Sequence, residues 1–380
     1  MKIGITCYPT YGGSGAVATE LGIALAASGH EVHFITYRQP FRLPSFLPRV
    51  FFHEVDVGRY PLFEYPPYDL ALAVKMHEVV LDRKLDILHC HYAIPHATSA
   101  WIAREMLRES GSDVKVMTTL HGTDITIVGQ EASFYAITKF SIEKSDSVTA
   151  VSDYLRDETV RAFGCSGCNV HVIPNFIDPE RFRRGNNLFP LPPETVDGRK
   201  VIMHISNFRP VKRVRDIVQT FARIQKEVSS LLVMVGDGPD RGDAEAEARE
   251  LGVSEHVLFL GKIDPVAPLL AGADIFLLPS DSESFGLSAL EALASGVPVI
   301  GANVGGLPSV VQHGTTGFLC DVGDVDGMAN AALGLLRDAA RWKQFSDAAA
   351  ADAQHRFSQD NVVAQYEALY HHTLTLPKHA

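Results

Sequence analysis

The chain has 380 residues, of which 46% are hydrophobic and 21% are charged, and its formal net charge is −11 at pH 7. This length predicts two domains, each with its own core. The negative charge argues against a general affinity for nucleic acid, so an anionic ligand would need a local cluster of cations. No apolar stretch approaches the ~20 residues of a membrane span, so no membrane segment is expected.

The five cysteines are scattered and odd in number. Such usage is typical of a reducing compartment, where structural disulfides are rare. The N-terminus has no basic region followed by an apolar one, so no secretory signal is predicted. We therefore expect a cytoplasmic protein.

Short apolar segments in the first half alternate with helical stretches. The predicted strands are residues 2–6, 31–36, 86–92, 114–122 and 147–152. Between the first two, residues 16–29 predict a helix that ends at Gly29. This alternation predicts a parallel sheet covered by helices on both faces.

The first glycine-rich segment, "GSGAVA" at residues 13–18, formally fits the dinucleotide-binding pattern G-x-G-x-x-G/A. A nicotinamide site also needs an acidic residue at the end of the second strand, but that strand ends in Thr36, Tyr37 and Arg38. One alternative is a tight turn with no ligand. The preferred interpretation is a loop whose backbone amides and Ser14 hydroxyl face a substrate, helped by the positive end of the next helix.

The proline-rich residues 172–194 interrupt the pattern and predict a linker. Six further strand-like segments follow, at residues 200–206, 230–238, 256–261, 274–280, 297–301 and 317–321. The predicted fold class is α/β, with two doubly wound Rossmann-like domains that face a central cleft. The expected boundaries are 1–178, a linker 179–198, 199–357, and a terminal helix 358–380. That helix is expected to pack back on the N-terminal domain, the alternative being that it caps its own domain.

The most informative segment is "SESFGLSALEALASGVPVIG", in which Glu283 and Glu291 are eight residues apart, a little over two helical turns. The residues "SFGL" stand at the predicted start of a helix, where free N–H groups and the helix dipole favour an anion. Glu283 would lie beside this turn and accept hydrogen bonds from sugar hydroxyls. Glu291 would lie deeper, suited to a ribose diol.

Cations gather in "SNFRPVKRVRDI", which follows a predicted strand and leads into a helix. A pyrophosphate would lie at such a position. Lys212 is assigned to the site because it follows a strand end in the same domain as the two glutamates. Arg213 and Arg215 are interpreted as solvated.

Glu283-x7-Glu291, the Lys212 loop, "GDGP" (236–239) and "PNFID" (174–178) together resemble the retaining family 4 glycosyltransferases of the GT-B fold, over essentially the whole chain. "GITCYPTYGGSGAVATELG", "HEVHFIT", "PFRL", "YPPYDLA", "HYAIPHA" and "TTLHGTDIT" resemble the branch of that family that acts in bacillithiol biosynthesis. The resemblance implies transfer of N-acetylglucosamine from UDP-GlcNAc to the hydroxyl of L-malate, with retention of the α configuration, as the first step of that pathway. It also implies an acceptor-binding N-terminal domain and a nucleotide-sugar-binding C-terminal domain.

The resemblance carries roles to matching residues. Glu291 would hold the UDP ribose, Lys212 would neutralise the leaving diphosphate, and His121 would contact the transferred sugar. Relatives have Gly-Arg where this chain has Ser206 and Asn207, so Arg209 is the candidate replacement for the phosphate arginine. The implied donor site is Gly13, Asn207, Arg209, Lys212, Glu283, Ser284, Phe285, Gly286, Leu287 and Glu291, and the candidate catalytic residues are Lys212, Glu283, His121 and Arg209.

For the acceptor, the resemblance implies a pocket lined by Ser14, Tyr92 and Thr119. Malate is a dianion, so we expect its second carboxylate to bind a cationic side chain. The candidate is Arg42 in "PFRL". The implied front-face mechanism needs no protein nucleophile. No Asp-x-Asp signature accompanies the nucleotide loop, so neither a metal nor a cofactor is expected. A half zinc site at Cys165 and Cys168 is disfavoured because no second pair exists.

Alternatives remain open at this stage. The acceptor could instead be an inositol phosphate, a sugar phosphate or a lipid. A UDP-GlcNAc epimerase on the same architecture would need no acceptor pocket, and a non-catalytic nucleotide-sugar sensor should have lost Lys212 or the glutamate pair. The apolar stretch 73–81 is a candidate surface between copies of the chain in a homo-oligomer.

Overall fold

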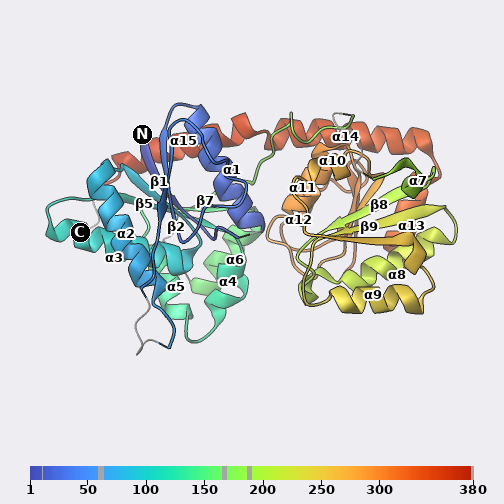
Figure 1. The fold of residues 1–380 in the computed structure, drawn as a ribbon, viewed down its shortest axis with the longest axis horizontal. Helices are drawn as coiled ribbons and strands as arrows, with labels where there is room; N and C mark the ends of the chain where they lie inside the picture. Colours follow the sequence, from blue (N-terminus) through green and yellow to red (C-terminus); the bar gives the residue numbers. More distant parts are fainter. Residues whose placement is uncertain (11, 59–63, 165–168, 186–190, 378–380) are drawn as a thin grey trace. The chain divides into compact units, whose positions relative to one another are not determined.

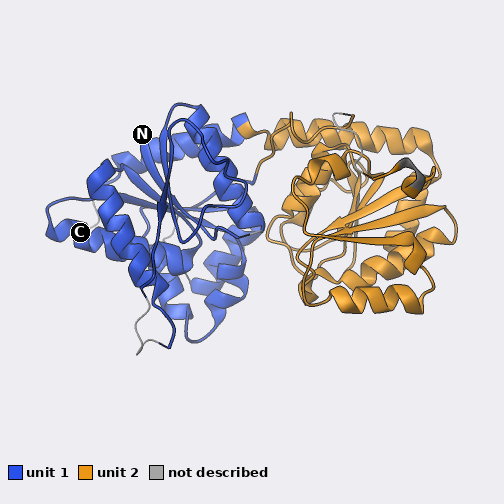
Figure 2. Cartoon of the chain, viewed as in Figure 1, with its two compact units in different colours: residues 1–175, 360–380 blue, residues 176–359 orange. Residues whose placement is uncertain are grey.

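The structure is a computed structural model that describes residues 1–10, 12–58, 64–164, 169–185 and 191–377. The chain divides into two compact units: unit 1 comprises residues 1–175 and 360–380, and unit 2 comprises residues 176–359 (Figure 2). Cys165 and Cys168 lie outside the described residues, as does the 186–190 part of the predicted linker.

Unit 1 is built on a parallel sheet of seven strands in the order β3-β2-β1-β4-β5-β6-β7 (Figure 1). The strands are β1 Lys2–Thr6, β2 Glu31–Thr36, β3 Val50–Glu54, β4 Ile87–His91, β5 Lys115–Leu120, β6 Ser147–Ala150 and β7 Val170–Val172. In the middle of the sheet, Ile3 of β1 is in register with Val32 on one side and Ile87 on the other. The central strands β1, β4 and β5 are buried along nearly their whole length, as expected where helices cover both faces.

The helices of unit 1 lie between successive strands, apart from the last one. They are α1 Gly13–Ala27, α2 Tyr68–Arg83, α3 Thr98–Glu109, α4 Thr123–Thr126, α5 Tyr135–Glu143, α6 Asp153–Phe163 and α15 Gln359–Thr375. The last of these returns from the end of the chain and bonds to the sheet. The Tyr370 hydroxyl lies 2.7 Å from His89 Nδ1, and the Thr373 hydroxyl lies 2.7 Å from that of Ser147.

Unit 2 repeats the architecture with six parallel strands in the order β10-β9-β8-β11-β12-β13. The strands are β8 Lys200–Ile205, β9 Ser230–Val235, β10 Val257–Gly261, β11 Ile275–Leu278, β12 Val299–Ala302 and β13 Gly317–Cys320. The helices are α7 Pro193–Val196, α8 Val214–Gln225, α9 Arg241–Glu250, α10 Ala267–Leu270, α11 Leu287–Ala294, α12 Leu307–Val310, α13 Val325–Leu336 and α14 Ala339–Phe357.

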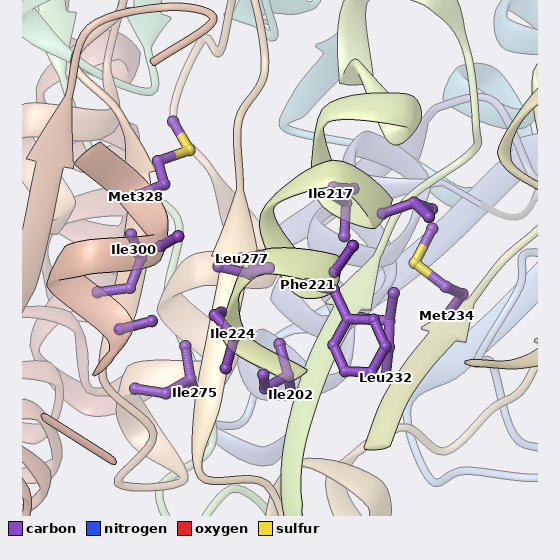
Figure 3. Close-up of a cluster of buried hydrophobic side chains, with 14 of the residues drawn as sticks. Ile202, Ile217, Phe221, Ile224, Leu232, Met234, Ile275, Leu277, Ile300 and Met328 are labelled. Atoms are coloured by element: carbon purple, nitrogen blue, oxygen red, sulfur yellow. The ribbon is translucent and has the colours of Figure 1, made fainter. Parts of the chain in front are cut away.

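On one face of this second sheet, the side chains of α8 pack against the strands and form a hydrophobic core (Figure 3). Ile217, Phe221 and Ile224 recur at helical spacing and are completely buried, so they form the apolar stripe of α8. They belong to the same buried cluster as Ile202 of β8 and Leu232 of β9. This packing holds the end of β8, and the loop that follows it, in place.

The predicted fold class is confirmed, because each unit is a doubly wound parallel sheet with helices. The structure adds two strands that the sequence pattern did not indicate, β3 and β7. Both lie at the edges of their sheet, and β3 is exposed along much of its length, so neither has the apolar run of a central strand. Among the described residues, no helix combines the length and the apolarity needed to cross a membrane.

Candidate active site

The strand order reverses once in each sheet, between β1 and β4 in unit 1 and between β8 and β11 in unit 2. At such a reversal, the loops after neighbouring strands diverge and leave room for a ligand at the carboxyl ends of the strands. The residues singled out by the sequence follow these strands or their neighbours. Each unit therefore has a candidate site of its own at the carboxyl ends of its strands.

The centre of the unit 2 site is an ion pair between two segments that are distant in the sequence. Lys212 Nζ lies 2.6 Å from Glu283 Oε1, and Ser280 Oγ donates a hydrogen bond of 2.8 Å to the same oxygen. Lys212 ends the short helix η3 Pro210–Lys212 after β8, and Glu283 follows β11. The Asp281 N–H also donates to the Val211 carbonyl, which ties the two loops together.

Next to this pair is the N-terminus of α11. The helix begins at Leu287 after Gly286, whose φ of 95° favours glycine, and no side chain caps it. Its first N–H groups are therefore available to an anion. Ser284 is half-buried and Phe285 is buried. Further along α11, which is largely buried, the Glu291 residue is only 5% exposed.

Glycines allow neighbouring loops to approach the backbone of these residues closely. A Cβ on Gly305 would lie 2.0 Å from the Glu283 carbonyl oxygen, and Gly305 has a φ of 55°. The next N–H, of Gly306, donates to that same carbonyl. In "GDGP", Gly236 and Gly238 likewise lie too close to the Ser206 and Asn207 carbonyls to carry a side chain. Backbone contact thus fixes both loops of the ion pair.

The other cations of the 206–217 segment differ in their surroundings. Arg209 is exposed, and within the described ranges its side chain has no hydrogen-bond or ion-pair partner. Asn207 is exposed as well. By contrast, Arg213 pairs with Asp216 and Asp281, and Arg215 pairs with Glu247. Arg209 is therefore the second cation, after Lys212, that can serve a ligand here.

In unit 1, the glycine-rich segment forms the start of α1. Gly13 is the first helical residue and is exposed, Ser14 is half-buried, and no side chain caps the helix. Gly15 has a packing role, because a Cβ there would lie 2.5 Å from the Tyr8 carbonyl oxygen. The segment thus presents uncapped N–H groups and the Ser14 hydroxyl.

A cluster of histidines lies after β4 and β5. His121, half-buried, follows β5, and its Nε2 lies 2.9 Å from His91 Nδ1 at the end of β4. The buried Asp124 carboxylate accepts hydrogen bonds from the N–H groups of His121, Gly122 and Ala93. Burial raises the pKa of Asp124 to about 6 and lowers the pKa of His121 to about 3. Burial also lowers the pKa of His91 well below its usual range. The imidazoles of His91 and His121 are therefore both neutral at pH 7.

The expected acceptor residues lie around the same strand ends. Tyr92 has a φ of 97°, its hydroxyl accepts a hydrogen bond from Thr123, and its N–H donates to the Thr119 carbonyl. Thr119 is completely buried, and its hydroxyl lies between His89 Nε2 and the Thr149 hydroxyl. The Thr119 side chain therefore forms hydrogen bonds within unit 1, and its carbonyl accepts a hydrogen bond from the Tyr92 N–H.

Arg42, the candidate cation for a second carboxylate, already lies near an acidic side chain. Its Nη1 is 3.6 Å from Glu20 Oε1 of α1, and its guanidinium lies over the Phe41 ring. The Arg42 side chain is only 13% exposed. A ligand carboxylate would have to share Arg42 with Glu20.

Sequence reasoning did not assign Ser280, Gly305, Asp124 or His91 to the site. Asp124 stands three residues after His121 in "LHGTD", and an acidic residue that close to a strand end can accept the N–H groups of its own loop. His89 and His91 share one face of a strand because alternate residues do so, but this spacing does not identify a hydrogen-bond partner. Ser280 and Gly305 carry no local signal, because their roles depend on contacts made through folding.

Two family models match the chain, one in each half. "Glycosyltransferase Family 4" matches residues 11–181, and "Glycosyl transferases group 1" matches residues 192–352. The chain is 49% identical over 376 residues to N-acetyl-alpha-D-glucosaminyl L-malate synthase of Bacillus anthracis, covering 98% of this chain and 97% of that protein. It is also 28% identical to a D-inositol 3-phosphate glycosyltransferase of Nocardia farcinica, covering 90% and 81% of the two chains.

Solved structures agree on the fold. A sucrose-phosphate synthase from Thermosynechococcus elongatus has a TM-score of 0.77 with 22% identity, covering 98% of both chains. The Anabaena protein HepE, in complex with UDP and glucose, has a TM-score of 0.75 with 19% identity, covering 97% of this chain and 99% of that one. The shared fold is that of two-domain glycosyltransferases.

Proposed function

Because this chain belongs to glycosyltransferase family 4, we propose that it transfers N-acetylglucosamine from UDP-GlcNAc to the hydroxyl of L-malate, the first step of bacillithiol biosynthesis. The observation that carries the proposal is the 49% identity, over nearly the full length of both chains, to a protein named for that product. The ion pair of Lys212 with Glu283, next to an uncapped helix N-terminus, is compatible with a sugar diphosphate donor.

The donor is assigned to unit 2. The N-terminus of α11, with Ser284, Phe285, Gly286 and Leu287, offers N–H groups to the diphosphate, and Lys212 and Arg209 supply positive charge. Asn207 borders the same loop. Glu283 accepts hydrogen bonds from the sugar hydroxyls, and the buried Glu291 accepts them from the ribose.

In the proposed reaction, the bond between sugar C1 and the β-phosphate oxygen breaks, and its electron pair leaves with UDP. The malate hydroxyl oxygen bonds to C1 from the same face, and its proton passes to the departing phosphate oxygen. The α configuration is thereby retained without a protein nucleophile. Lys212 and Arg209 stabilise the charge that develops on the diphosphate, which is electrostatic catalysis by fixed groups.

The acceptor is assigned to unit 1. Ser14 and the uncapped start of α1 suit one carboxylate of malate, while Tyr92, held by Thr119, lines the same pocket. Gly13 offers its amide to the diphosphate, and His121 contacts the transferred sugar. Arg42 is the candidate for the second carboxylate. A cytoplasmic location and a homo-oligomer remain part of the proposal. The apolar stretch 73–81 is not the expected oligomer surface, because Met76, Val79 and Val80 are buried in the core of unit 1.

Release of UDP from UDP-GlcNAc is expected to depend on L-malate and to persist in EDTA, because protein cations rather than a metal neutralise the leaving group. The measurement is a coupled UDP assay with and without malate, each with and without EDTA, followed by chromatographic identification of the glycoside. Inositol phosphate and a sugar phosphate serve as competing acceptors.

The outcomes separate the parts of the proposal. UDP release with another acceptor but not with malate would overturn the acceptor assignment. Loss of release in EDTA, restored by a divalent cation, would overturn metal independence. Formation of the epimeric sugar nucleotide without transfer would replace the transferase by an epimerase.

Replacing Gly305 with alanine is expected to lower kcat/KM for UDP-GlcNAc by about 10²-fold, because the new Cβ would displace the Glu283 backbone. Gly314→Ala is the matched control, since Gly314 also has a positive φ, of 77°, but a Cβ there would meet nothing within 4 Å. Steady-state kinetics compares the two variants, and thermal unfolding measures the strain that they share. Equal kcat/KM values for both would contradict the role of Gly305.

A further inference from the structure

The two histidines at the ends of β4 and β5 form a directed pair. His91 Nδ1 and His121 Nε2 lie 2.9 Å apart, with ring centroids 5.1 Å apart and an interplanar angle of 24°. His91 is completely buried, whereas His121 is half-buried. Within the described part of the chain, the remaining ring nitrogen of His121, Nδ1, has no hydrogen-bond partner.

The surroundings hold both members in place. His96 Nδ1 donates a hydrogen bond of 2.7 Å to the His91 carbonyl, and the His89 ring packs 4.4 Å from the His91 ring, centroid to centroid. On the other side, the Asp124 carboxylate accepts a hydrogen bond of 3.2 Å from the backbone N–H of His121. The relative orientation of the two rings is therefore set before any ligand binds.

The proton between the rings has two possible origins, since a neutral imidazole carries one N–H. If His121 Nε2 donated, His91 would carry its own proton on Nε2. That atom is buried and has no partner among the described residues. A buried N–H without an acceptor costs about 1–3 kcal/mol and is rare in folded proteins. The remaining arrangement places the proton on His91 Nδ1, which then donates to His121 Nε2.

From this geometry we infer that His91 is a positioning residue that fixes His121 in the Nδ1–H tautomer. His121 then presents a hydrogen-bond donor, never a bare lone pair, to the substrate oxygen that it contacts. This role rests on the proposed function in one respect, namely that His121 contacts the transferred sugar. The tautomer itself depends only on the contacts of unit 1.

The tautomer can be measured without turnover. In the full-length chain labelled with ¹⁵N-histidine, two-bond ¹H–¹⁵N correlations distinguish Nδ1–H from Nε2–H imidazoles, and His121→Gln assigns the signal. We expect His121 in the Nδ1–H form in the wild type and a mixture of tautomers in His91→Leu. His91→Asn should keep the wild-type form, because its amide N–H can occupy the position of His91 Nδ1–H.

Kinetics provides the second measurement. His91→Leu is expected to lower kcat about 10²-fold with a smaller change in the KM for UDP-GlcNAc, as for a loss of orientation. His91→Asn should restore most of this loss. His33→Leu is the matched control, because His33 of β2 is equally buried but bonds to His53 and Glu31 instead. It should leave kcat unchanged.

An Nε2–H signal for His121 in the wild type would overturn the inference, and so would full kcat in His91→Leu. Failure of His91→Asn to recover activity while it keeps the tautomer would also overturn the positioning role. If the wild type releases no UDP with malate, the proposed function fails, and the spectra alone decide whether His91 sets the tautomer.

Discussion

Lys212→Met is expected to lower kcat for UDP release by about 10²–10³-fold, with a smaller rise in the KM for UDP-GlcNAc. The proposed reaction develops negative charge on the leaving diphosphate. Lys212 is the cation that the fold holds 2.6 Å from Glu283, the proposed sugar-binding residue. Removal of one fixed group that stabilises developing charge typically costs this much. Because the charge develops mainly in the transition state, the loss should be seen in kcat rather than in binding.

The matched control is Arg215→Met. Arg215 stands three residues later in the same cationic segment, but it is 58% exposed and pairs with Glu247. Its removal changes the net charge equally and should leave kcat unchanged. Initial-rate kinetics with saturating malate compares the variants, and thermal unfolding checks that the loss of the Lys212–Glu283 pair does not unfold unit 2. A Lys212→Met enzyme with most of the wild-type kcat would contradict the assignment.

Asp146→Ala is expected to destabilise unit 1 by about 3–5 kcal/mol, because it leaves a buried arginine without its counter-ion. Arg104 is 1% exposed and Asp146 is 2% exposed, and Arg104 Nη1 lies 2.9 Å from Asp146 Oδ2. The same carboxylate accepts hydrogen bonds from Lys115 Nζ and from the Val116 N–H. It therefore joins α3, the start of β5 and the turn before β6.

The chain offers a direct readout of this loss. One of its two tryptophans, Trp101, lies in α3, and the other, Trp342, lies in unit 2. In a Trp342→Phe background, fluorescence during urea unfolding reports unit 1. Glu78→Ala is the control, since Glu78 is 54% exposed and pairs with Lys75 on the same helix, a contact worth about 0–1 kcal/mol. If both variants lost the same free energy of unfolding, the larger cost expected for breaking a buried ion pair would be refuted.

Most of the fold could be predicted from the sequence because a central parallel strand is buried on both faces and is therefore rich in apolar residues. Each strand from β8 to β13 coincides with a predicted segment, although β12 extends one residue beyond its segment, and five strands of unit 1 lie within theirs. The edge strands β3 and β7 were not predicted, because an edge strand need not be buried on both faces. Phe51 and Phe52 of β3 are 40% and 38% exposed, and β7 has only three residues, so neither shows a buried pattern.

The candidate site was predictable only where its signal is local. The spacing of Glu283 and Glu291, and the glycine before α11, can be read along one stretch of chain. Ser280 could not be assigned in that way, because a serine near a glutamate occurs throughout the sequence. Its role appears only when Ser280 Oγ is found 2.8 Å from the oxygen that Lys212 also contacts.

The sequence by itself determined the two alternating halves, the helix start at α11 and the positions of the candidate catalytic and binding residues. It could do so because periodicity and spacing are properties of neighbouring residues. Only the tertiary structure decided which of them meet. Lys212 and Glu283 are 71 residues apart, and His91 and His121 are 30 apart. They come together because β8 pairs with β11 and β4 with β5, so the carboxyl ends of those strands converge. The same alternating pattern is compatible with many strand orders, and long-range packing selects one of them.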